Sequence, residues 1–72
     1  MFNESKPKGI VKAKRLNVRS GPGINYEIVS VLNSGEKFDI LYETWDSNNN
    51  TWYRINSYDK QEYVSASYVL KT

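Results

Sequence analysis

The stretch that decides the fold is Leu16-Asn17-Val18-Arg19-Ser20-Gly21-Pro22-Gly23. Its first four residues alternate between apolar and polar side chains, a pattern with the period of two that is typical of a strand with one buried face. Leu16 and Val18 share a face and can enter a core, while Asn17 and Arg19 point the other way. The stretch therefore predicts a strand that contributes two residues to the core.

A turn has to follow this strand. Gly21 and Gly23 allow backbone angles that side chains forbid, and Pro22 fixes the φ angle between them. We expect Arg19 to stabilise the loop by pairing with an acid or with the carbonyl groups of the loop. A contact between Arg19 and a ligand is the alternative.

Outward from this stretch, short apolar runs alternate with turn residues, and no segment of eleven residues keeps a helical period. The pattern predicts an all-β fold of short, mostly antiparallel strands that form a small barrel. Phe38, Ile40 and Tyr42 are expected on one strand face, and Phe38 and Trp52 in the core. Strands are expected over residues 9–14, 16–19, 28–32, 38–43, 51–55, 62–64 and 68–70.

The size and composition favour a binding module over an enzyme. The chain has 72 residues, with no cysteine and no histidine. A disulfide, a Cys-type zinc site, a thiol nucleophile and a histidine base are therefore excluded. Residues 1–8 are polar and predict a flexible linker, and residues 9–72 predict one domain. The scattered carboxylates are interpreted as solubilising charge, and a catalytic pair of the glycosidase type is the alternative.

The charge is unevenly distributed. Residues 1–19 hold six basic residues and one acid, a net charge of +5, while residues 20–72 hold four basic residues and seven acids, a net charge of −3. The basic segment either lies against the acidic remainder or contacts an anionic polymer. No segment approaches the roughly 18 apolar residues of a membrane span, and residues 1–9 have no signal-peptide core. We therefore expect no membrane insertion. We also expect any export signal of the parent protein to lie outside this chain.

The quoted stretch resembles the opening motif of the bacterial SH3-like family, Leu-Asn-Val-Arg-Ser/Ala-Gly-Pro. Trp52-Tyr53-Arg54-Ile55 resembles the Trp-Tyr-Lys/Arg-Val strand of that family, and Glu62-Tyr63-Val64 stands where Gly-Trp-Val is usual. The resemblance covers roughly residues 9–70. It implies an SH3-like barrel that binds a peptidoglycan stem or cross-bridge peptide without catalysis, as part of a larger surface protein or wall hydrolase. It also implies an extracellular place at the cell wall or cell surface.

The many aromatic residues suggest where a ligand would bind. Six tyrosines and two tryptophans exceed what so small a core can bury, and such side chains suit recognition of peptides or sugars. We expect a groove between the loop of residues 21–27 and the loop of residues 45–50. Its predicted lining is Asn25, Tyr26, Trp45, Asp46, Asn48, Tyr53 and Tyr68. Each tyrosine could instead be a packing residue at the rim of the barrel. The residues also leave open whether Trp52 or Tyr53 faces the core.

Three other binding functions are alternatives to wall binding. A structural or regulatory domain that packs against a neighbouring catalytic domain is the main alternative, and would turn the exposed aromatics into an interface. Binding of proline-rich peptides suits aromatic grooves, but the first loop differs from that of eukaryotic SH3 domains. Nucleic-acid binding is disfavoured by the acidic later strands. We expect no cofactor and no metal, and a monomer.

Overall fold

The computed structural model describes residues 7–72, and they form an all-β fold. The linker predicted over residues 1–8 lies largely outside the described residues, and Lys8 already belongs to the first strand. The elements are β1 (Lys8–Val11), β2 (Arg15–Arg19), β3 (Ile28–Asn33), β4 (Lys37–Trp45), β5 (Thr51–Ile55), β6 (Tyr63–Ser65), the 3₁₀ turn η1 (Ala66–Tyr68) and β7 (Val69–Lys71). The predicted all-β SH3-like fold is confirmed.

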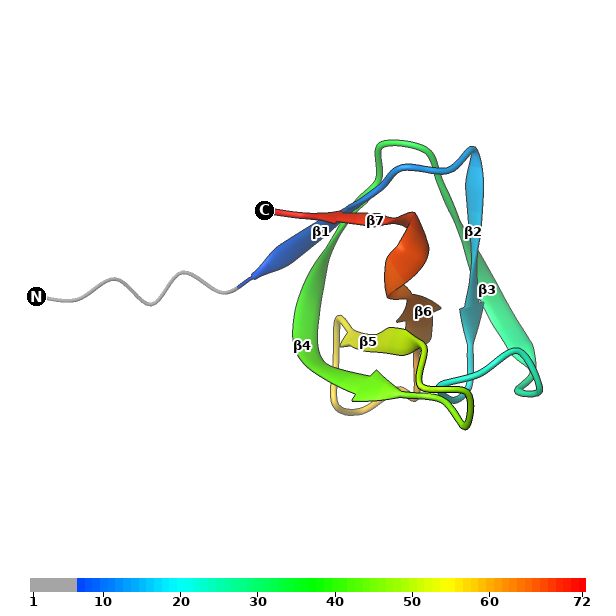
Figure 1. The fold of residues 1–72 in the computed structure, drawn as a ribbon. Coiled ribbons are helices and arrows are strands. Elements are labelled where there is room, and N and C mark those ends of the chain that lie inside the picture. Colours follow the sequence, from blue (N-terminus) through cyan, green and yellow to red (C-terminus); the bar gives the residue numbers. More distant parts are fainter. Residues whose placement is uncertain (1–6) are drawn as a thin grey trace, which may run out of the picture.

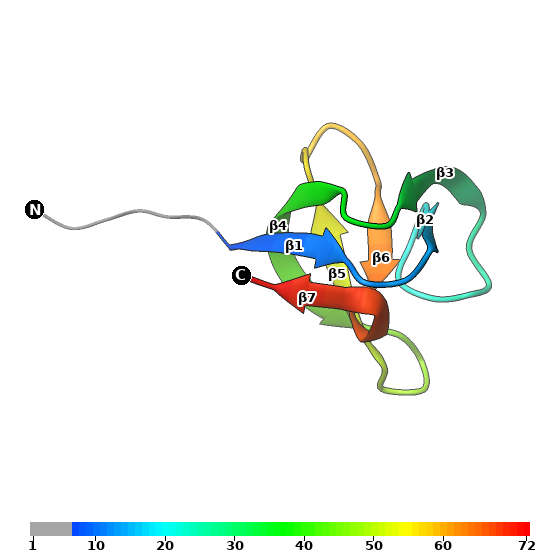
Figure 2. The same cartoon turned by 90° about the horizontal axis from the view of Figure 1, so that it is seen from above.

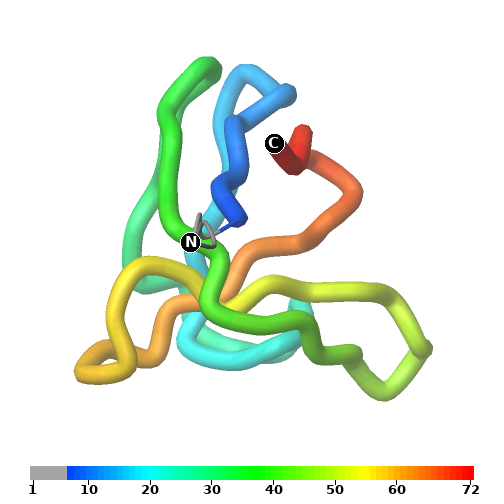
Figure 3. Tube along the Cα trace, turned by 90° about the vertical axis from the view of Figure 1, so that its left-hand side faces the viewer, coloured from blue at the N-terminus to red at the C-terminus, as the bar shows by residue number. Residues whose placement is uncertain are grey.

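The strands form one strongly curved sheet in the order β3-β2-β6-β5-β4-β1-β7, with every neighbouring pair antiparallel. The sheet curls around a single core, so that β1 and β7 lie side by side across from β2 (Figures 1 and 2). The same closure appears along the Cα trace, where the C-terminal strand runs back beside the first one (Figure 3). Strands β3 and β7 are the two edges of the sheet.

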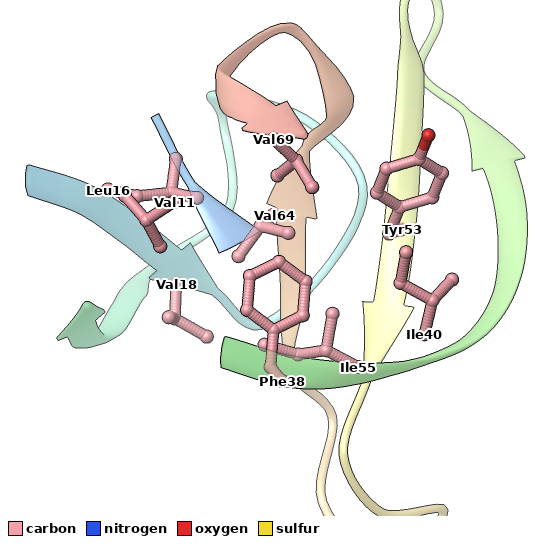
Figure 4. Close-up of a cluster of buried hydrophobic side chains, with 9 residues drawn as sticks. All are labelled: Val11, Leu16, Val18, Phe38, Ile40, Tyr53, Ile55, Val64 and Val69. Carbon is pink, nitrogen blue, oxygen red and sulfur yellow. The ribbon is translucent and has the colours of Figure 1, made fainter. Parts of the chain in front are cut away.

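The core consists of apolar side chains from six of the seven strands. It contains Val11, Leu16, Val18, Phe38, Ile40, Tyr53, Ile55, Val64 and Val69 (Figure 4). Leu16 and Val18 enter it as the alternation in β2 predicts. Gly9 pairs with Phe38 across β1 and β4, and a β-carbon on Gly9 would lie 2.5 Å from the Phe38 ring. Glycine is therefore needed there for the aromatic ring to enter the core.

Strand β4 is longer than expected and bends partway along its length (Figure 1). Its pairing with β5 shifts between Ile40 and Tyr42, which marks a bulge. The prediction that Tyr42 shares a face with Phe38 and Ile40 is wrong, because the extra residue turns Tyr42 outward to Arg54 and Tyr63.

Strand β5 is buried on both faces, which the alternation of its residues could not indicate. Tyr53 and Ile55 enter the core, while Trp52 and Arg54 lie under other groups on the opposite face. Trp52 is buried as expected, but outside the central cluster. Tyr63 is buried, and its ring packs beside the Arg54 guanidinium.

Candidate functional site

The outer face of β2, β6 and β5 forms the floor of a hollow. Because side chains alternate along a strand, Arg15, Asn17 and Arg19 lie on the face of β2 that points away from the core. Trp52 of β5 pairs directly with Ser65 of β6 beside them. The floor is therefore mixed, with an indole between polar and charged groups.

We call this space the larger hollow. It has a volume of about 550 Å³. The loop of residues 20–27 bounds it on one side, and the loop of residues 46–50 and η1 complete the rim. The lining residues are Arg15, Leu16, Asn17, Arg19, Ile24, Asp46, Asn50, Trp52, Ser65, Ser67 and Tyr68.

A smaller hollow of about 400 Å³ lies between the same two loops. Its lining residues are Pro22, Gly23, Ile24, Asn25, Tyr26, Trp45, Asp46, Ser47 and Asn48. Ile24 and Asp46 line both spaces, so the two hollows adjoin at these residues. We refer to the two together as the groove.

Asp46 orders the loop that separates the hollows. Its Oδ1 accepts the backbone N–H groups of Asn48 at 2.8 Å and Asn50 at 2.9 Å. Its Oδ2 accepts the Nδ2 of Asn50 at 3.2 Å and the indole N–H of Trp52 at 3.0 Å. These donors stabilise the carboxylate and lower the pKa of Asp46, with the backbone N–H of Asn50 as the largest cause and the Trp52 indole next. Asn49 completes the turn with a φ of 65°.

Arg19 holds the loop on the other side of the groove. Its Nη1 donates to the carbonyl oxygens of Ile24 at 3.2 Å and Tyr26 at 3.0 Å, as the loop-stabilising interpretation predicted. The Tyr26 ring packs directly on Gly21, where a β-carbon would overlap it. Gly23 has a φ of 152°, and a β-carbon there would lie near both the Tyr26 ring and the Asp46 side chain of the other loop.

The structure brings most of the seven predicted site residues together. Five of them line the smaller hollow, namely Asn25, Tyr26, Trp45, Asp46 and Asn48. Asp46 also lines the larger hollow, where Tyr68 lies at the rim. Trp45 and Tyr68 are more than half exposed, at 59% and 51%, so their rings are accessible to a ligand.

Tyr53 is the exception, and its predicted place in the groove is wrong. It is only 7% exposed and belongs to the core cluster (Figure 4). It lines neither hollow. It lies on the inner face of β5 together with Ile55, whereas the groove lies on the outer face with Trp52.

Sequence reasoning missed the floor of the larger hollow. The residues concerned are Arg15, Asn17, Asn50, Trp52, Ser65 and Ser67. The alternation in β2 placed Asn17 away from the core, which was a usable signal. Ser65 and Ser67 gave no such signal, because the pairing of β6 with β5 brings Ser65 beside Trp52, and Ser67 follows in η1.

A second polar cluster lies outside the groove. Arg54 is 9% exposed, and its Nη1 donates to the hydroxyls of Tyr42 at 3.3 Å and Tyr63 at 3.2 Å. Its Nη2 donates to the carbonyls of Tyr58 at 3.1 Å and Lys60 at 2.9 Å. Arg54 thus ties the β5–β6 connection to the sheet, and we assign it a structural role.

The two phenols of this cluster have pKa values that are shifted in opposite directions. The hydrogen bond from Tyr63 and then that from Arg54 lower the pKa of Tyr42. The hydrogen bond with Tyr42 and then burial raise the pKa of Tyr63.

The groove is suited to binding an extended ligand. It offers accessible aromatic faces together with amide, hydroxyl and guanidinium groups. Within residues 7–72, no three Asp or Glu side chains are placed to hold a metal ion. No helix in this part of the chain is long and apolar enough to cross a membrane.

Comparison with known sequences decides the family. The model of the family described as "Bacterial SH3 domain" matches residues 14–69, which include the whole groove. The chain belongs to the bacterial SH3 domain family. The matched part of this bacterial SH3 domain runs from just before β2 to the first residue of β7. The family resemblance of the Leu16–Gly23 motif is therefore confirmed.

Two curated relatives contain a segment similar to this bacterial SH3 domain. A Listeria innocua protein named "Probable endopeptidase p60" is 37% identical over 67 residues, which cover 92% of this chain and 14% of that protein. A Synechocystis protein named "Serine/threonine-protein kinase D" is 40% identical over 42 residues, which cover 58% of this chain and 8% of that protein. The chain thus spans less than a sixth of either relative.

A solved structure has the same fold. The crystal structure of Ly7917 superposes with a TM-score of 0.70 at 24% sequence identity, covering 85% of this chain and 26% of that chain. At this level of identity the likeness concerns the fold.

Proposed function

We propose that this bacterial SH3 domain is a non-catalytic module that binds a peptidoglycan stem or cross-bridge peptide in the groove. In this role it holds a larger surface protein or wall hydrolase at the cell wall, outside the cell. The observation that carries the proposal is the pair of adjoining hollows, which share Ile24 and Asp46 and have the exposed rings of Trp45 and Tyr68 at their rims.

The shape and chemistry of the groove support a peptide ligand. Wall peptides are thin, flexible and polar, and two adjoining hollows can hold such a strand along its length. Aromatic faces contact its apolar parts, while Asn25 and Asn48 offer both donors and acceptors to its amides. Family membership and the similarity to the Listeria endopeptidase agree with a wall-associated role.

The direct test is co-sedimentation of the purified domain with Gram-positive sacculi, before and after removal of teichoic acids. The variant Trp45→Ala/Tyr68→Ala removes one exposed ring from each hollow. We expect the wild type to pellet in both cases, and the variant to bind at least about tenfold more weakly, since truncation of two anchors costs about 1 kcal/mol or more each.

Tyr58→Ala is the matched control, because Tyr58 is 67% exposed and lines neither hollow. It should pellet like the wild type. If the wild type does not pellet, or pellets only while teichoic acids are present, binding of wall peptides is refuted.

A second candidate function rests on strand β3. This edge strand exposes Ile28, Val29 and Val31, and it carries no charged residue. Such an edge is open to a neighbouring domain of the parent protein, as expected for a structural or regulatory interaction module. In a longer parent protein, hydrogen exchange at Val29 and Val31 should be slower than in the isolated domain. Equal exchange rates would exclude this packing.

A further inference from the structure

The charged groups of the larger hollow are unequal in their ability to bind a ligand. This hollow contains one carboxylate, that of Asp46, and two guanidinium groups, those of Arg15 and Arg19. Which of the three is available determines which charge a ligand must carry.

Asp46 is fully occupied within its own loop. Each of its two oxygens accepts two hydrogen bonds from Asn48, Asn50 and Trp52. A ligand ammonium would have to compete with these four donors, which also maintain the loop. The carboxylate is therefore a poor partner for a cationic ligand.

Arg19 is also partly engaged. Its Nη1 holds the carbonyls of Ile24 and Tyr26 and so maintains the loop of residues 20–27. Movement of this side chain toward a ligand would release the wall of the groove.

Arg15 differs from both. Its side chain is exposed and lines the larger hollow, and its guanidinium makes no hydrogen bond or ion pair to any of residues 7–72. This end of the hollow thus presents a guanidinium without an internal counter-ion.

We infer that the larger hollow selects a peptide with a free carboxylate and that Arg15 is the residue that binds it. The inference rests on the proposed function and specifies the ligand class. A planar guanidinium pairs with a carboxylate through two parallel hydrogen bonds. Among the other lining residues, Asn17, Ser65 and Ser67 are uncharged donors, and Arg19 is held by the carbonyls of its loop. This set suits a single carboxylate rather than the repeated charges of a polyphosphate.

The test is a calorimetric titration with a synthetic stem tetrapeptide, in one form with free carboxylates and in another with every carboxylate amidated. The variants are Arg15→Gln and, as the matched control, Lys37→Gln, because Lys37 is exposed and lies outside the groove. We expect the free form to bind the wild type about tenfold more tightly than the amidated form, the effect of one charge-assisted contact.

Arg15→Gln should remove this preference by weakening only the free form, and Lys37→Gln should leave it intact. Equal binding of the two forms, an equal loss for both with Arg15→Gln, or no binding of either peptide would overturn the inference. Retention of sacculus binding in those cases would leave the proposed function standing. In a further assay, poly(glycerol phosphate) competes with sacculi for the domain. If it displaces the wild type but not Arg15→Gln, and the domain does not prefer either peptide, Arg15 would instead be assigned to a phosphate ligand.

Discussion

The carboxylate of Asp46 accepts the indole N–H of Trp52 at 3.0 Å, and this bond joins the loop between the two hollows to the floor of the larger one. Trp52 is almost fully buried, so its N–H needs a partner within the protein. Asp46 supplies that partner while it orders the turn that ends at Asn50.

This relationship predicts an acid-dependent loosening of the loop. The pKa of Asp46 in the folded protein lies below its usual value of 3.8. Its contribution to stability is therefore fully present above that usual value and is lost as the pH falls through the lower folded value. In NMR spectra, the indole N–H resonance of Trp52 should shift in this acidic range.

Asp46→Asn provides the control for this titration. An amide presents N–H groups of its own to the Trp52 or Asn50 donors, so the loop should already be loosened at neutral pH and the acidic shift should vanish. A Trp52 resonance that titrates at or above the usual aspartate value would contradict the assignment.

Gly21 and Tyr26 should behave as an energetically coupled pair. The Tyr26 ring packs where a β-carbon on Gly21 would lie, so Gly21→Ala should destabilise the fold by about 1–3 kcal/mol through overpacking. Urea denaturation measures this loss. In the double variant Gly21→Ala/Tyr26→Ala, the cost of the added methyl group should largely disappear.

Gly35→Ala separates steric from conformational effects. Gly35 has a φ of 85°, and no atom of residues 7–72 lies within 4 Å of a β-carbon built there. The cost of Gly35→Ala, about 1 kcal/mol, should therefore come from the backbone alone and should add to that of Tyr26→Ala. Additive costs for Gly21→Ala and Tyr26→Ala would show that the ring contact is not the reason for glycine at position 21.

Arg54 should be essential for stability and not for binding. Its replacement by methionine leaves the hydroxyl of Tyr63 and the carbonyls of Tyr58 and Lys60 without their donor, at an expected cost of about 2–3 kcal/mol in urea denaturation. Arg54→Lys should not restore stability, because an ammonium cannot reach both sides of the cluster. A loss below about 0.5 kcal/mol would show that water replaces the guanidinium without penalty.

The tyrosines beside Arg54 should ionise in two separate steps. Relative to the usual value of 10.0, Tyr42 should ionise earlier and Tyr63 later. The lowered pKa of Tyr42 adds stability as the pH rises toward 10.0, and the raised pKa of Tyr63 removes stability above it. Absorbance at alkaline pH follows both steps. Tyr42→Phe should abolish the early step, and an unchanged early step would show that it belongs to another tyrosine.

Local sequence determined much of this protein. The Leu16–Gly23 stretch predicted a strand, its buried face and the loop held by Arg19, because alternation and glycine conformation are properties of neighbouring residues. The composition of the loops at residues 21–27 and 45–50 also predicted a groove between them, and the smaller hollow lies there.

Tertiary structure decided the rest. Both faces of β5 are covered, so the order of its side chains did not indicate which face is the core. The structure places Tyr53 in the core and Trp52 in the groove. The bulge after Ile40 turned Tyr42 away from the core, and the pairing of β5 with β6 brought Ser65 beside Trp52. The availability of Arg15 likewise followed only from the hydrogen bonds that occupy Arg19 and Asp46. Strand pairing and hydrogen-bond partners join residues far apart in the chain, and a pattern of adjacent residues does not contain them.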